Sequence, residues 1–153
     1  MKLLFKIIIS LAVFNCFGLS SFAMLPPYVY EQIQKESEIK AIATVKKVKV
    51  INKSKYSVEK KVTFRLEKDF EKANIPKEFT GKCKSATKFI TYFIGSGEVY
   101  FDPQKNDRVF VTVTKNGGKI TGYTLLTPEL ENKINNNYGE MKFGSDGVYF
   151  KPD

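Results

Sequence analysis

Alternation of apolar with polar side chains over residues 58–67 restricts this chain to a β-rich fold more than any other feature of the sequence. A period of two places neighbouring side chains on opposite faces of a strand, so one face is buried and the other is wet. The same period recurs over residues 109–114 and 119–126, which predicts two further strands. The apolar positions of the first segment are Val58, Val62, Phe64 and Leu66.

The apolar positions of residues 38–50 change parity along the segment. They are odd-numbered through Val45 and even-numbered from Val48, and the change falls at Lys46 and Lys47. A strand keeps its apolar side chains on one face across such a change only if one extra residue is inserted. We therefore expect a β-bulge at Lys46 and Lys47, in a long and bent first strand.

The stretch T-K-N-G-G-K-I-T, residues 114–121, resembles the end of a phosphate-binding loop but does not complete one. Such a loop needs glycine at position 113 and Ser or Thr at position 120, where this chain has Val113 and Ile120. Asn and Gly instead tolerate the positive φ angles of a tight hairpin turn. We expect residues 116–118 to connect two antiparallel strands.

Two helices are expected at the edges of this β-rich region. Pro26 and Pro27 suit the start of a short helix over residues 28–37. Thr127 is a good N-cap, and Pro128 a good first residue, for a second helix that ends at Asn135–Asn136–Asn137. The apolar face of this second helix would carry Leu130, Ile134 and Tyr138.

The remaining segments predict further strands. Residues 78–94 are rich in Phe, Thr, Ile and Tyr and indicate one or two strands. Residues 99–101 and 148–150 indicate short ones, the latter after a turn over residues 144–147.

Residues 1–23 have the features of a secretory signal peptide. Two lysines precede an apolar stretch over residues 7–14, and small side chains at Ser21 and Ala23 suit cleavage after Ala23. The stretch is shorter than the ~20 residues that span a bilayer, which disfavours a membrane anchor. We therefore expect an exported protein, periplasmic or secreted, with no transmembrane segment after cleavage.

Lipoprotein processing at Cys16 is a further alternative for the N-terminus. Phe14 and Asn15 are poor matches to the small residues that such processing requires. Cleavage after Ala23 leaves 130 of the 153 residues, which suits a single domain over residues 24–153. A monomer is expected.

Cys83 is the one cysteine that remains after cleavage, so an intrachain disulfide is excluded. Its neighbours Lys82 and Lys84 would lower the pKa of an exposed thiol and make it reactive. In a strand, however, Cys83 shares its face with Phe79 and Phe89. This parity favours a buried, unreactive side chain.

The residue types of most catalytic and metal sites are missing. The chain has no histidine, which excludes Ser-His-Asp and Cys-His arrangements and leaves few ligands for zinc. Asp102 and Asp107 lie in a polar segment that lacks the spacing of a calcium loop, so a turn is the simpler interpretation. No catalytic, cofactor-binding or metal-ligating residue is expected. A small hydrolase with paired carboxylates is the weakest of the function hypotheses.

The number of basic residues is the feature of the sequence that indicates a function, because clustered lysines would bind anions. The net charge is +9, and removal of two lysines with residues 1–23 leaves +7. If the lysines of the first strands share one face, they form an anion-attracting surface; otherwise they are solvated side chains that protect strand edges. An exported protein meets acidic polysaccharide, phosphate groups, anionic lipid or acidic proteins more often than nucleic acid. These lysines are Lys46, Lys47, Lys49, Lys53, Lys55, Lys60 and Lys61, followed by Lys82, Lys84 and Lys88.

The order of these features resembles the netrin-like and tissue-inhibitor-of-metalloproteinase class of OB-fold barrels. The resemblance lies in E-I-K-A-I-A-T-V-K-K-V, K-K-V-T-F-R-L-E-K-D-F and D-R-V-F-V-T-V-T, over roughly residues 38–127. It implies a small antiparallel barrel. Protease inhibition in that family needs a cysteine at the mature N-terminus, where this chain has Met24, so that activity is not carried over.

A shorter stretch, S-G-E-V-Y over residues 96–100, is similar to the S-G-x-x-Y motif of periplasmic lysozyme inhibitors. The similarity implies that Ser96 enters a lysozyme active site, and an inhibitor of this kind would have Ser96 and Tyr100 protruding from the barrel. The disulfide usual in that family is absent here, and a structural turn is the alternative interpretation.

The sequence therefore predicts a mainly β, small antiparallel OB-like β-barrel with one or two short helices. We expect a non-enzymatic binding module for an anionic envelope component or a protein partner, without cofactor, and an inhibitor of a secreted enzyme as the alternative. The expected partner-binding residues are Lys46, Lys47, Lys49, Lys53, Lys55, Ser96 and Tyr100.

Overall fold

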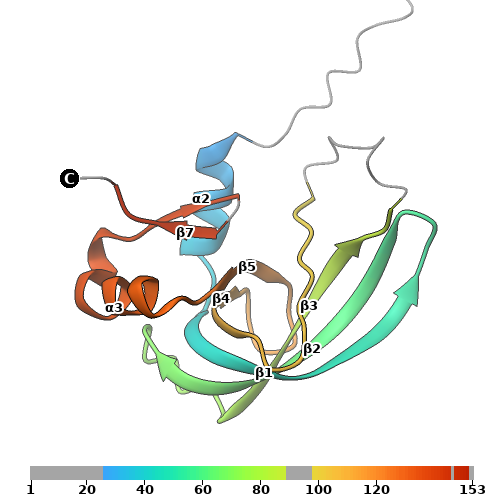
Figure 1. The fold of residues 1–153 in the computed structure, drawn as a ribbon, viewed down its shortest axis with the longest axis horizontal. Coiled ribbons are helices and arrows are strands. Elements are labelled where there is room, and N and C mark those ends of the chain that lie inside the picture. The colour runs from blue at the N-terminus through green and yellow to red at the C-terminus, as the bar shows by residue number, and fades with distance from the viewer. Residues whose placement is uncertain (1–25, 89–97, 146, 152–153) are drawn as a thin grey trace, which may run out of the picture.

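The computed structural model describes residues 26–88, 98–145 and 147–151 (Figure 1). The expected signal peptide, Ser96 and part of the expected strand region over residues 78–94 lie outside this part of the chain. In chain order the elements are α2 (Pro27–Lys35), β1 (Ile39–Lys53), β2 (Ser57–Asp69), β3 (Glu78–Ala86), β4 (Arg108–Val113), β5 (Ile120–Leu125), α3 (Pro128–Asn137), the 3-10 helix η2 (Tyr138–Glu140), β6 (Lys142–Gly144) and β7 (Gly147–Tyr149).

The main sheet has five antiparallel strands in the order β3-β2-β1-β4-β5, and β6 and β7 form a separate hairpin. The expected mainly β fold with two short helices is confirmed. Within the described residues no closed barrel is found. An isolated parallel bridge links Lys82 of β3 to Lys119, the residue before β5. No helix in the described part of the chain is long and apolar enough to cross a membrane.

The β-bulge expected in the first strand is present. The pairing of β1 with β2 shifts between Val45 and Lys47, so that Val45 lies opposite Phe64 and Val48 opposite Val62. Val45 is buried, and Val48 packs against the same core. The inserted residue keeps both valines on one face, which is the physical reason for the parity change in the sequence.

The hairpin expected around the glycine pair is also confirmed. Antiparallel β4 and β5 are joined by a turn in which Gly117 has φ of 81° and the Gly118 amide donates to the Lys115 carbonyl at 2.7 Å. The Thr114 hydroxyl accepts from the Lys119 amide at 3.0 Å. Glycine, which has no Cβ, adopts the conformation of Gly117 at no steric cost.

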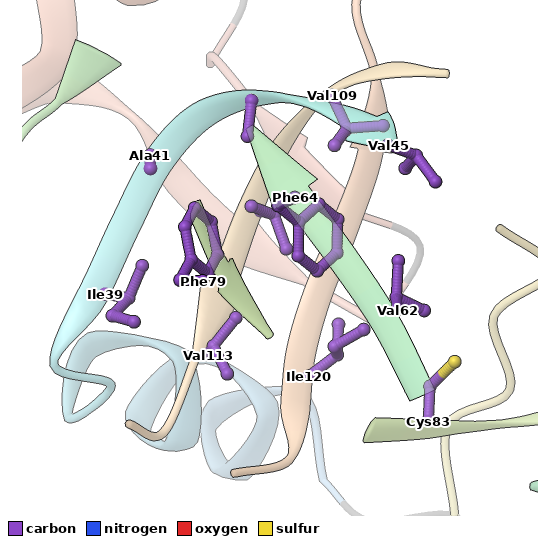
Figure 2. Close-up of a cluster of buried hydrophobic side chains, with 12 residues drawn as sticks. Ile39, Ala41, Val45, Val62, Phe64, Phe79, Cys83, Val109, Val113 and Ile120 are labelled. Carbon is purple, nitrogen blue, oxygen red and sulfur yellow. The ribbon is translucent and has the colours of Figure 1, made fainter. Parts of the chain in front are cut away.

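The first core lies on the inward face of the curved sheet (Figure 2). Phe64 and Phe79 stack at its centre with ring centroids 5.0 Å apart, and β1, β4 and β5 contribute aliphatic side chains around them. Cys83 lies at the margin of this cluster. Its buried position confirms the interpretation from strand parity.

A second core covers the opposite face of β1 and β4. Ile42 and Phe110 point away from the first core and pack with Ile134 of α3, Met141 and Phe143. Figure 1 shows α3 and the β6–β7 hairpin gathered on this side of the molecule. The Thr127 hydroxyl accepts from the Leu130 amide at 3.1 Å, which confirms the predicted N-cap of α3.

Two expectations about short strands were wrong or incomplete. Residues 99–101 form no strand, because only Tyr100 makes an isolated parallel bridge, to Lys84. The last expected strand exists as β7, but its partner β6 was not predicted. Phe143 is the only buried side chain of β6, and three residues are too few to show a period.

We predict that Gly81→Ala lowers the free energy of unfolding by about 1–3 kcal/mol. A Cβ at this position would lie 2.6 Å from Cγ1 of Ile120, where β3 crosses the start of β5. Urea denaturation measures the change. Gly139→Ala is the matched control, because nothing lies within 4 Å of its added Cβ, and it should shift stability by no more than about 0.5 kcal/mol. Equal losses in both variants would contradict the close approach.

Candidate functional site

Four lysines stand directly opposite one another across the sheet. Lys49 of β1 lies opposite Lys61 of β2, and Lys61 lies opposite Lys82 of β3. The parallel bridge then connects Lys82 to Lys119. We call these four residues the lysine row.

The lysine row faces outward. Val62 and Cys83, the chain neighbours of Lys61 and Lys82, are buried in the first core. Because neighbouring side chains of a strand point to opposite faces, Lys61 and Lys82 point to solvent. All four lysines of the row are exposed.

None of these four lysines makes an ion pair with another described residue, whereas other lysines nearby do. Lys60 pairs with Asp102 at 2.7 Å, and Lys84 pairs with Glu98 at 2.6 Å. Like charges directly opposite each other on a sheet are destabilising by up to ~1 kcal/mol per pair. The row therefore concentrates positive charge that forms no ion pair with the described residues.

The rows on either side of it are less basic. Lys47 lies opposite Thr63, which lies opposite Thr80. On the other side Asn52 lies opposite Glu59, and Glu59 opposite Lys84. The positive charge is thus focused on one line across the sheet.

The five lysines expected as partner-binding residues do not form one cluster. Lys47 and Lys49 lie on the outward face, whereas Lys46, at the bulge, forms an ion pair with Glu78. Lys53 ends β1, and Lys55 lies in the turn with its ammonium group 5.4 Å from the ring centroid of Tyr56. Only Lys49 belongs to the lysine row.

Lys119 is the member of the row that the sequence did not indicate. It joins the row because the Gly117 amide donates to the Thr80 carbonyl at 2.7 Å and the Lys82 amide donates to the Gly118 carbonyl at 2.8 Å. These bonds hold the hairpin turn against β3. They connect segments far apart in the sequence, and no local pattern reveals them.

Tyr100 belongs to a different environment from the one expected of a protruding inhibitor residue. It is half-buried, and its hydroxyl donates to Glu98 at 3.3 Å. Glu98 also accepts a hydrogen bond from Lys84, which lowers the pKa of Glu98 and raises that of Lys84. Ser96 lies outside the described residues, so its expected role stays a prediction.

The described residues give little support for a metal site or a reactive cysteine. No group of three His, Cys, Asp or Glu side chains that could hold a metal occurs in residues 26–88, 98–145 and 147–151. Burial raises the pKa of Cys83 to about 11, despite an opposing effect of Lys60. The thiol is therefore neutral at physiological pH.

No protein-family model, curated protein or solved structure matches the chain.

We predict that Cys83 reacts with a thiol reagent about a hundredfold more slowly in the folded protein than in urea at pH 8, because thiolate is the reactive form. A Cys16→Ser variant makes Cys83 the only thiol for the measurement.

The contribution of this thiol to the free energy of unfolding should be constant below about pH 9 and should fall as the pH rises toward 11. Rapid stoichiometric labelling of the folded protein would contradict burial.

Proposed function

We propose that this protein is an exported, non-enzymatic binding module that attaches to an anionic envelope component through the lysine row. The observation that carries the proposal is the row itself, with Lys49, Lys61, Lys82 and Lys119 side by side and without ion pairs in the described residues. Such an arrangement costs folding free energy and raises the local concentration of anions.

The spacing of the row favours a ligand with repeated charges. Neighbouring strands lie about 4.8 Å apart, so four lysines across three such spacings extend over roughly 14 Å. A single small anion would engage one or two ammonium groups of such a line. An anionic polymer, or a layer of anionic headgroups, can engage all four.

An OB-like barrel and a monomeric state belong to the same proposal. The bridge between Lys82 and Lys119, together with the hydrogen bonds of Gly117 and Gly118 to β3, supports a sheet that curls until its outer strands approach. Parallel closure of this kind would seat the end of the lysine row at the seam of the barrel. The netrin-like resemblance is consistent with this curvature.

We predict that Lys61→Gln and Lys82→Gln each weaken retention on immobilised polygalacturonate by roughly 3–10-fold at 0.1 M salt. Each variant should also lower the slope of log affinity against log salt by about one, because one fewer counterion is released. Lys133→Gln is the matched control. It removes the same charge from the exposed face of α3 and should change retention little.

Two outcomes would revise the proposal. Equal losses in all three variants would mean that retention follows net charge, and the lysine row would not be a site. Binding to phosphatidylglycerol vesicles without binding to polygalacturonate would assign the row to a lipid surface. The vesicle arm is included because Val50 and Ile51, beside Lys49, are 53% and 47% exposed.

A further inference from the structure

The lysine row ends at a pocket of about 370 Å³ between β3 and the glycine turn. Lys82 and Lys119, the last two members of the row, line it. Glu59, Lys84 and Glu98 also line it, and Val99 contributes an apolar side chain. The volume lies within the range of small-molecule sites in proteins.

Some of the charged side chains that line the pocket form ion pairs, and others do not. Lys82 and Lys119 make no ion pair with a described residue, and neither does Glu59. Glu98 is held by Lys84 at 2.6 Å and by the hydroxyl of Tyr100 at 3.3 Å. The pocket therefore offers two ammonium groups that make no ion pair and, among the same lining residues, carboxylate oxygens that can accept hydrogen bonds.

The wall of the pocket is fixed by backbone hydrogen bonds. Gly117 and Gly118 line it without side chains, and both are bonded to β3, to Thr80 and Lys82 respectively. The Thr80 amide also donates to the side chain of Asn116 at 3.0 Å. A pocket whose wall is held in this way loses little conformational entropy when a ligand binds.

This mixture of groups discriminates between classes of anion. Inorganic phosphate or sulfate presents acceptors on every side, so some of them would face the carboxylates of Glu59 and Glu98. A sugar acid has its charge at one end and hydroxyl donors elsewhere. Its carboxylate can meet Lys82 and Lys119 while its hydroxyl groups donate to Glu59 or Glu98, and its ring packs on Val99.

We infer that this pocket binds one unit of an acidic sugar, a hexuronate, as the specificity site of the lysine row. The inference rests on the proposed function, because the row would hold the chain to which that unit belongs. The row supplies charge that any polyanion can use. The pocket supplies the contacts that distinguish a uronic acid from other anions.

The test is a titration of the isotope-labelled protein with D-glucuronate, followed by the amide NMR signals of Val99, Gly117 and Gly118. We expect saturable shifts with glucuronate and at least tenfold weaker effects from D-glucose and inorganic phosphate. Lys119→Gln should weaken glucuronate binding roughly tenfold, as expected for the loss of one charge-assisted hydrogen bond. The NMR spectrum of each variant shows whether it folds.

Two variants separate the pocket from the row and from simple charge attraction. Glu59→Gln should weaken glucuronate binding but not phosphate binding, because an amide oxygen accepts from a hydroxyl group more weakly than a carboxylate does, and the negative charge that opposes phosphate is lost. Lys49→Gln should leave glucuronate binding unchanged while weakening retention on polygalacturonate, because Lys49 belongs to the row but does not line the pocket.

Failure of the inference and failure of the proposed function give different results. Retention on polygalacturonate that depends on the row, with no saturable glucuronate shifts, would overturn the pocket and leave the proposed function standing. Glucuronate binding without row-dependent retention would overturn the proposed function and support the pocket. Equal shifts with phosphate and glucuronate, or stronger glucuronate binding by Glu59→Gln, would overturn the assignment of the ligand class.

Discussion

The extra residue between Val45 and Lys47 determines what the main sheet can present to solvent. Without it, continued alternation from Val45 would turn Lys47 and Lys49 inward and Val48 outward. With it, Val48 packs on the first core and Lys49 lies opposite Lys61 on the outward face. The same backbone irregularity therefore preserves the core and completes the lysine row.

Ion pairs also link the central strands to α3 at the boundary of the second core. Arg108 of β4 binds Glu67 of β2 at 2.7 Å and forms a two-pronged ion pair with Glu131 of α3. Its hydrogen bonds lower the pKa of Glu131. Arg108 thus joins β4 and β2 to the helix that covers Phe110. The second core also includes Ile42 of β1, the strand that carries Lys49.

Local patterns predicted the elements whose signals are local. The bulge at Lys46 and Lys47, the hairpin at Gly117 and the N-cap at Thr127 each follow from a few neighbouring residues. The prediction of a strand over residues 99–101 was wrong, because three residues do not show whether a neighbouring strand pairs with all of them. The candidate site was harder to predict. In the sequence Lys46 does not differ from the lysines near it, but in the structure it forms an ion pair with Glu78. Lys119 joins the lysine row only through contacts between β3 and a turn that is distant in the sequence.

The glycine turn between β4 and β5 joins buried strands to an exposed surface, and these two parts tolerate substitution differently. Its outer residues place Lys119 and one wall of the pocket, whereas the buried side chains of the hairpin begin on either side of it, at Val113 and Ile120. Lys119 can therefore change while the apolar interior is retained, whereas the φ of 81° at Gly117 favours glycine in the turn itself. A substitution at Lys119 would change the charge of the surface at this loop and leave the buried strands in place.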